Sequence, residues 1–275
     1  MTEIRLEKLI NSAQAVLKNN EHDSPPFAIF TFKNITEIRE VPIVKPLLVF
    51  LLSGRKEIKG EIDAICTAGQ FLFLSNKFGV DMRIVPSEHE CFALGIEFDF
   101  RDFDIFPHKP KLENNPIIGE IDTVLENTLG QFLEWVSFSS PDLWPGRKQE
   151  LLKVLYQRGY TQVSAITQLS SLSHKVFYIL NSFVSEDLKA DFVSSRLGMS
   201  EPTLRRKLKR EGTSFIEIKD RVRLGLGFRL IQTSDYPIRE VSEKCGYKSQ
   251  SQFTEKFKSQ FGATPTFLRK TRMSL

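Results

Sequence analysis

The spacing of apolar residues changes twice along this chain of 275 residues. Residues 1–19 place apolar side chains every three or four positions, which predicts a helix. Residues 27–100 instead hold short runs rich in Val, Ile and Phe, separated by Gly, Pro, Asn and Ser. From 117 to about 184 the helical period returns. The pattern therefore predicts one helix, then a β region, then a helical remainder.

The β region is typical of an all-β sandwich or barrel, and we interpret it as a small jelly-roll-like unit. Breaker-rich stretches at 19–26 and 108–116 bound it on both sides. Gly, Pro and Ser positions inside the region mark turns between strands. The predicted strands are 27–32, 44–52, 57–66, 70–75, 80–85 and 91–100.

One apolar stripe follows steps of three and four through residues 117–137. Such a stripe either packs inside the chain or pairs with its copy in a homodimer, and the sequence leaves both interpretations open. The residues of the stripe are Ile118, Ile121, Leu125, Leu129, Phe132 and Val136.

Residues 186–262 contain an internal repeat. Each copy has apolar residues at i, i+3 and i+7 and then a glycine, which predicts a short helix ended by a left-handed turn. A serine that suits an N-cap follows each turn. Helix, turn and capped helix, occurring twice, predict a tandem helix-turn-helix. The copies are Ala190, Val193, Leu197, Gly198 and Ser200, then Ile238, Val241, Cys245, Gly246 and Ser249.

Charge separates this segment from the rest of the chain. Residues 186–275 hold 19 Lys/Arg and 11 Asp/Glu, a balance of +8, whereas residues 1–185 have a balance of −4. In the helix after Ser200, Leu204 and Leu208 define the buried side, and Arg206 projects almost opposite. A solvated basic face would explain such a helix on its own. Within a repeated helix-turn-helix, the cationic face instead favours insertion into a DNA major groove.

Two stretches carry a family resemblance: MSEPTLRRKLKREGTSF (199–215) and CGYKSQSQFTEKFKSQFGATP (245–265). They resemble the DNA-binding domain of the AraC/XylS family of bacterial transcription regulators, over about 185–270. The first is most similar to members that control virulence and acid-stress genes in enteric bacteria. The β region followed by helices resembles, more loosely, the family's regulatory and dimerising half.

The resemblance implies an α+β fold. The N-terminal half would be a cupin-like, jelly-roll β domain with additional helices, and the C-terminal half an all-α tandem helix-turn-helix domain. The implied divisions are a regulatory β domain with its N-terminal helix (1–107), a helical dimerisation or linker region (108–172) and an AraC-type DNA-binding domain (173–275).

The resemblance also implies two recognition helices, joined by a long helix at about 214–232, which enter successive major grooves. Gln250 and Gln252 suit adenine or backbone contacts. The first helix would present Pro202, Thr203, Arg205 and Arg206, with Arg210 beside them, and the second Gln250, Ser251, Gln252, Thr254 and Glu255. Candidates for phosphate contacts, which position the protein without specifying sequence, are Lys209, Lys256, Lys258 and Arg269.

The sequence departs from the family pattern at three places. Glu255 stands where the family often has Arg, so it either accepts from cytosine N4 or the second helix reads bases weakly, and we favour weak readout. Gly225 and Gly227 lie inside the connecting helix, which predicts either close helix packing or a flexible connector. Leu268 replaces a common Tyr, a change we assign to packing. The expected buried stripe of the connecting helix is Phe215, Ile218, Val222 and Leu226.

Chemistry in the N-terminal half is sparse. Its aromatics favour a packed core, with an apolar effector pocket as the alternative. Arg55 and Lys56 lie at an expected hairpin, where they are either exposed turn charges or partners of an anionic group. The histidines and the three cysteines show no metal-ligand spacing, and no catalytic motif is present, so we predict no metal, no cofactor and no enzyme. The aromatics are Phe27, Phe30, Phe32, Phe50, Phe71, Phe73, Phe92 and Phe98.

The sequence thus predicts a sequence-specific DNA-binding transcription regulator, with activation favoured over repression. Its expected partners are double-stranded promoter DNA, RNA polymerase, a small apolar or anionic effector, and a second copy bound through 117–137. Two alternatives remain: control by a partner protein without a small ligand, and a cupin-like enzyme with an appended DNA-binding domain. No signal peptide or membrane segment is evident, so a cytoplasmic, nucleoid-associated protein is expected.

Overall fold

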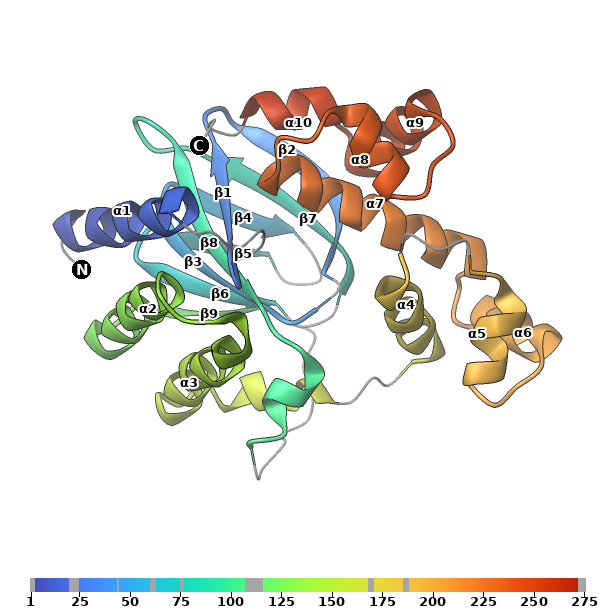
Figure 1. Ribbon diagram of the computed structural model, residues 1–275, viewed down its shortest axis with the longest axis horizontal. Helices are drawn as coiled ribbons and strands as arrows, with labels where there is room; N and C mark the ends of the chain where they lie inside the picture. The colour runs from blue at the N-terminus through green and yellow to red at the C-terminus, as the bar shows by residue number, and fades with distance from the viewer. Residues whose placement is uncertain are drawn as a thin grey trace.

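The computed structural model describes residues 3–19, 25–43, 45–59, 63–74, 77–106, 116–167, 171–184 and 188–271. An antiparallel β sandwich forms the centre of the N-terminal half (Figure 1). Helices α1, α2 and α3 cover one side of it, and helices α4 to α10 form the C-terminal part beside it. The predicted α+β class, with a β sandwich before an all-helical C-terminal domain, is confirmed.

The sandwich consists of two antiparallel sheets. Sheet A has the strand order β1-β8-β3-β6-β9, and sheet B has the order β2-β7-β4-β5. The strands are β1 (Ala28–Phe32), β2 (Thr36–Ile43), β3 (Leu47–Ser53), β4 (Arg55–Lys59), β5 (Ala64–Thr67), β6 (Gln70–Leu74), β7 (Lys77–Val85), β8 (Cys91–Glu97) and β9 (Ile117–Glu120).

The central strands of sheet A, β3, β6 and β8, are buried on both faces, which explains their continuous apolar runs. Successive side chains of a strand point to opposite faces. In β3, Phe50 faces the helical layer while Val49 and Leu51 face sheet B. Most of the phenylalanines singled out in the β region lie in these two cores, as the core interpretation expects, and only Phe30 is partly exposed.

Strand β2 is absent from the predicted strands, and a bulge explains why. Its pairing with β7 shifts between Ile38 and Val41, where Glu40 adopts a left-handed φ of 51°. The extra residue reverses the parity of the strand, so Ile38 and Val41 face the same core although their spacing is odd. The alternation that marks a half-buried strand is therefore lost.

Two further boundaries differ from the prediction. The single strand expected at 57–66 is instead the hairpin of β4 and β5. Residues Ile117–Glu120, assigned to a helical stripe, form strand β9 on the edge of sheet A beside β6. The helix begins only at Thr123, where the Asp122 carboxylate caps it by accepting from the Leu125 amide at 2.9 Å.

The helical layer on sheet A consists of α1 (Glu3–Asn19), α2 (Thr123–Val136) and α3 (Trp144–Gln157). The apolar stripe of α2 lies inside this layer. The five stripe residues that begin with Ile121 and end with Val136 are each at most 2% exposed. Of the two interpretations of the stripe, packing inside the chain therefore holds, and a homodimer through 117–137 stays a prediction that would have to use other residues of this segment. The described part of the expected linker region shares a core with the sandwich rather than standing apart from it.

Helices α4 to α10 form two small cores joined by one long helix. Phe215, Ile218 and Val222 of α7 pack into the first core, and Leu224 and Ile231 pack into the second. The expected stripe was wrong at Leu226, which is only partly buried, because the buried face rotates midway along the helix. The helices are α4 (Leu172–Ser182), α5 (Ala190–Arg196), α6 (Glu201–Arg210), α7 (Phe215–Thr233), α8 (Ile238–Lys244), α9 (Gln250–Phe261) and α10 (Pro265–Thr271).

The second of these cores is continuous with the sandwich interior. Helix α7 packs against β1 and β2, and α9 packs against β2. At the margin, Arg229 of α7 pairs with Glu97 of β8 at 3.5 Å, and the Gln260 amide of α9 donates to the Glu40 carbonyl at 3.4 Å. Helices α5 and α6 lie at the opposite end of α7, away from the sandwich (Figure 1).

Gly227 marks close packing between α7 and α9. A Cβ built there would lie 2.7 Å from a ring carbon of Phe253 and 3.3 Å from the Cys245 sulfur. Of the two explanations for glycine in the connecting helix, close packing therefore holds at this position.

We expect Gly227→Ala to lower the thermal unfolding midpoint, because the Phe253 ring must move to admit the methyl group. The control is Gly130→Ala in α2, where a Cβ meets only Leu9 at 4.0 Å. That change should stabilise by up to about 1 kcal/mol through helix propensity. Thermal denaturation followed by circular dichroism compares the two, and a stabilised Gly227→Ala protein would contradict the packing argument.

Candidate nucleic-acid interface

The first helix-turn-helix consists of α5, a glycine turn and α6. Helix α5 ends at Arg196 with Leu197 as its C-cap, and Gly198 follows with a left-handed φ of 65°. Helix α6 then begins after Ser200 and buries Leu204 and Leu208 completely. The repeat deduced from sequence is confirmed for this copy.

Ser200 occupies the N-cap position without the expected cap. Its side chain accepts no backbone N–H group, and its hydroxyl instead donates to Thr203 Oγ1 at 2.9 Å. The amide groups of the first turn of α6 are thus left without a serine cap, at the positive end of the helix.

The outward face of α6 is cationic and open to solvent. Arg206 is exposed directly opposite the buried leucines, with no ion pair to another described residue. Arg205 is held by Glu201 on the same helix, with Nη2 and Oε1 at 2.6 Å. The exposed members of the predicted set are Pro202, Arg205, Arg206, Lys209 and Arg210, and Thr203 is half-buried.

The second helix-turn-helix repeats the design with aromatic packing. Gly246 has a φ of 75° after α8, and Ser249 caps α9 by accepting from the Gln252 amide at 3.2 Å. Phe253 and Phe257 are fully buried. This copy also agrees with the sequence prediction.

The outward face of α9 is less cationic than that of α6. Glu255 is exposed on it, as its helical angle predicts. Lys256 is half-buried, and its ammonium forms an ion pair with the Asp220 carboxylate of α7 at 2.5 Å. A lysine that the sequence predicts to contact phosphate is therefore already paired within the protein. The exposed members of the predicted set are Gln250, Ser251, Gln252, Glu255 and Lys258, and Thr254 and Lys256 are half-buried.

Arg269 is placed differently from the other predicted DNA contacts. Its guanidinium donates to the Tyr236 carbonyl at 2.5 Å, and its Nε and Nη2 atoms are buried. Burial also lowers the pKa of this group. In this conformation Arg269 ties α10 to the loop before α8, so its guanidinium does not point toward solvent as a phosphate contact requires.

Glu211 positions the start of helix α4, and the sequence alone did not indicate this role. The Glu211 carboxylate, just after α6, accepts from the amides of Leu172 at 2.9 Å and Ser173 at 2.8 Å. It thereby caps α4 from 39 residues away and ties that helix to the end of α6. Burial opposes its ionisation, but hydrogen bonds from Ser173 and Leu172 outweigh this and lower the pKa of Glu211. No local signal pairs these positions.

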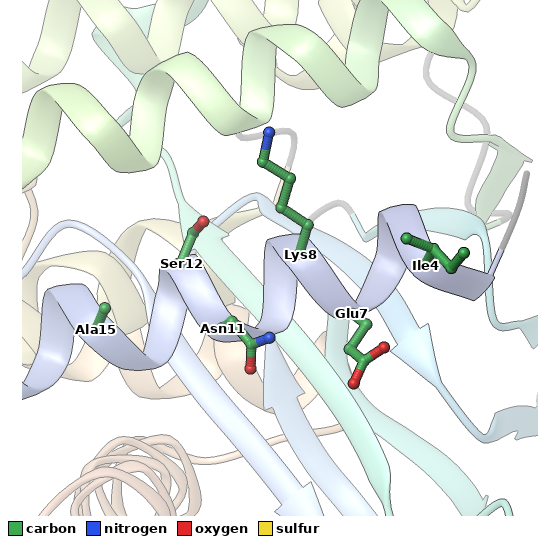
Figure 2. Close-up of a pocket in the computed structure, with 6 residues that line it drawn as sticks. All are labelled: Ile4, Glu7, Lys8, Asn11, Ser12 and Ala15. Carbon is green, nitrogen blue, oxygen red and sulfur yellow. The ribbon is translucent and has the colours of Figure 1, made fainter.

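Other chemistry in the described residues is limited. Among them, no three His, Cys, Asp or Glu side chains come together as a metal site would require. No helix within the described ranges is long and apolar enough to span a bilayer. A shallow, open depression of about 450 Å³ lies on α1, with Ile4, Lys8 and Ser12 among its lining residues (Figure 2). It is on the opposite side of the molecule from α6 (Figure 1).

Comparison with known sequences finds matches to the C-terminal part of the chain. Residues 193–271 match a family model described as a helix-turn-helix domain. The HTH-type transcriptional regulator AdiY of Escherichia coli is 34% identical over 94 residues, which are 34% of this chain and 37% of that protein. A urease operon transcriptional activator of the same species is 35% identical over 79 residues, 29% of this chain and 27% of that protein. The chain thus aligns with only about a third of these relatives' length.

Comparison with solved structures covers nearly the whole chain. A fatty-acid-bound ToxT from Vibrio cholerae strain SCE256 has a TM-score of 0.69 at 12% identity, covering 92% of this chain and 98% of ToxT. ToxT from strain O395 bound to (E)-4-(8-methylnaphthalen-1-yl)but-3-enoic acid has a TM-score of 0.67 at 12% identity, covering 89% and 98%. At this identity the likeness concerns the fold: a β sandwich joined to a pair of helix-turn-helix units. Residues 193–271 themselves are a helix-turn-helix domain of the AraC type.

We expect Glu211→Gln to destabilise the protein near neutral pH, by about 1 kcal/mol or less because the carboxylate is largely solvent-screened. Since the folded pKa is lowered, this contribution is present above the ordinary pKa of a glutamate, 4.5, and is lost as pH falls below it. Urea unfolding at several pH values should show the variant and wild type converging under acid conditions. Glu255→Gln, on an exposed side chain, is the control, and a constant difference at every pH would contradict the charge-dependent cap.

Proposed function

We propose that this protein is a sequence-specific DNA-binding transcription regulator that inserts α6 and α9 into successive major grooves of promoter DNA. The observation that carries the proposal is the exposed cationic face of α6, displayed by a helix-turn-helix whose opposite side is fully buried. A second helix-turn-helix, joined to the first through α7, supplies the other recognition helix.

In this proposal α6 contributes more to base readout than α9 does. Helix α6 provides base readout through Arg206, with Lys209 and Arg210 near phosphates. Helix α9 contributes Gln250 and Gln252 but turns Glu255 toward the DNA, and it positions more than it specifies. Because Arg269 is directed inward, its role in the proposal is structural rather than electrostatic.

The N-terminal sandwich acts as the regulatory half in our proposal. ToxT, which shares the fold, has been crystallised with an unsaturated fatty acid and with a naphthalenyl butenoic acid, both carboxylic acids with apolar bodies. We propose an effector of the same chemical kind here. By analogy with the urease operon activator, we favour activation, through contact with RNA polymerase in the cytoplasm. The protein has no catalytic role in this scheme.

Control by a partner protein, without a small ligand, is the second candidate. Phe138, just after α2, and Leu143 are both more than half exposed, which favours a protein contact at that corner of the helical layer. A thermal-stability screen against carboxylic acids, sugars and inorganic anions separates the two, because a ligand of the native state raises the unfolding midpoint. The absence of any shift would favour the partner.

We expect Arg206→Ala to weaken binding to a site selected from random duplexes by about 5–150-fold and to relax its sequence preference. DNase footprinting at fixed salt measures both effects. Lys153→Ala, an exposed lysine of α3, removes the same charge away from the proposed interface and should bind as wild type. Unchanged protection by Arg206→Ala would show that α6 is not the reader.

Glu255→Gln tests the role of α9. If α9 chiefly positions, removing a negative charge near phosphates should raise affinity by about twofold to tenfold, with the same preferred sequence. If Glu255 accepts from a cytosine, the change should instead cost about 1–3 kcal/mol at that base pair. Competition binding with single-base variants of the selected site distinguishes these results, and the second outcome would overturn the positioning role.

A further inference from the structure

Lys56 has an unusual place in the sandwich. Strand β4 alternates so that Lys56 and Ile58 point inward, and Lys56 is only 6% exposed. Its neighbour Arg55 behaves as an ordinary surface residue, exposed and paired with Glu57 at 2.7 Å. Of the two cations that the sequence places at this hairpin, one is therefore inside the protein.

The Lys56 ammonium lies between the two sheets. It is 5.7 Å from the centre of the Phe30 ring on β1 of sheet A. Burial lowers the pKa of Lys56, and electrostatic interaction with Cys91 of sheet A and Cys66 of sheet B opposes this shift. Because the Lys56 side chain leaves sheet B on its buried face and brings its ammonium near a ring of sheet A, the ammonium lies between the sheets.

No described carboxylate balances this charge. Burial raises the pKa of Cys66 to about 12 and also raises that of Cys91, so both thiols are neutral near pH 7. Burial lowers the pKa of Lys56 itself. A buried cation without a counter-ion is unfavourable, and an anion placed beside it would relieve the cost.

The surroundings define which anion fits. The neighbouring inward residues, such as Ile58, Ile84 and Leu51, are apolar, which suits an apolar body rather than a sugar or nucleotide. A single ammonium neutralises a single negative charge. A phosphate dianion would leave surplus charge in an apolar interior, so a carboxylate matches the site better.

Small residues of β8 lie beneath the partly exposed Phe30 ring. The inward residues of β8 are small: Cys91, Ala93 and Gly95. The Phe30 ring covers Gly95 so closely that a Cβ there would lie 2.8 Å from it, and Phe30 is partly exposed. The ring thus fills the position above Gly95 at the edge of the sandwich, and its displacement would uncover the small residues of β8.

We propose that the sandwich interior beside Lys56 is a binding site for a monocarboxylic acid with an apolar body, with the Lys56 ammonium holding the carboxylate and the body replacing the Phe30 ring above Gly95. This deepens the effector role and rests on the proposed function. Since α7 packs against β1, the strand that carries Phe30, an occupied site would press on the strand beneath the helix that joins both helix-turn-helix units.

The test uses the full-length protein with dodecanoate, below its micellar concentration, and 1-dodecanol as the uncharged analogue. Isothermal titration calorimetry should show wild type preferring the acid by about tenfold or more. Lys56→Met should bind acid and alcohol equally while unfolding at the wild-type temperature or above, because an apolar side chain suits the interior. Lys56→Gln provides a second uncharged variant should the first fail to fold.

Lys59→Met is the matched control, since it removes a cation from the exposed end of the same strand. It should keep the preference for the acid. Failure of wild type to bind dodecanoate, or wild-type preference in Lys56→Met or Lys56→Gln, would overturn the proposal. Footprinting of the same proteins without ligand tests the DNA-binding function independently of the acid site. A missing wild-type footprint would contradict the proposed DNA binding. An intact footprint, together with loss of the acid preference in the Lys56 variants, would place the acid site at Lys56.

Discussion

Burial of helix α7 on two different faces is the constraint on which the rest of the C-terminal structure depends. Its first half supplies Phe215, Ile218 and Val222 to the core of one helix-turn-helix, and its second half supplies Leu224 and Ile231 to the other. The other helices of each unit are short, so both cores depend on side chains that α7 supplies. The shared helix therefore stabilises both units and also sets the separation between α6 and α9.

The same helix connects both helix-turn-helix units to the sandwich, and the second unit makes the larger contact. The core around α8, α9 and α10 continues into the sandwich interior, and Arg229 and Gln260 add polar contacts at its margin. The unit of α5 and α6 has its own core, with α4 tied to it by Glu211. The bulge at Glu40 lies where α9 meets β2, so the most irregular part of the sheet is also a domain contact. One helix-turn-helix unit is therefore packed against the sandwich, and the other lies away from it.

The two helix-turn-helix units also differ in the charge that α6 and α9 expose. On α6, the exposed cations outnumber the acidic partner available to them, and Glu201 engages only Arg205. On α9, Asp220 engages Lys256, and Glu255 adds a negative charge to the outward face. Formal charge along the sequence shows that positive charge is concentrated in this third of the chain, but only pairing in space shows which cations remain available.

Local rules determined much of this protein from its sequence. Glycine turns after Leu197 and Cys245, serine N-cap positions and apolar steps of three and four define both helix-turn-helix units, because these signals act within a few residues. Tertiary structure alone decided features that join distant segments: the bulged strand β2, the strand at Ile117–Glu120, the covered stripe of α2 and the cap from Glu211. It also decided that Lys56 points inward and Arg269 is tied to Tyr236. Burial and pairing of a charged side chain depend on what the rest of the chain places against it, and no local pattern encodes that.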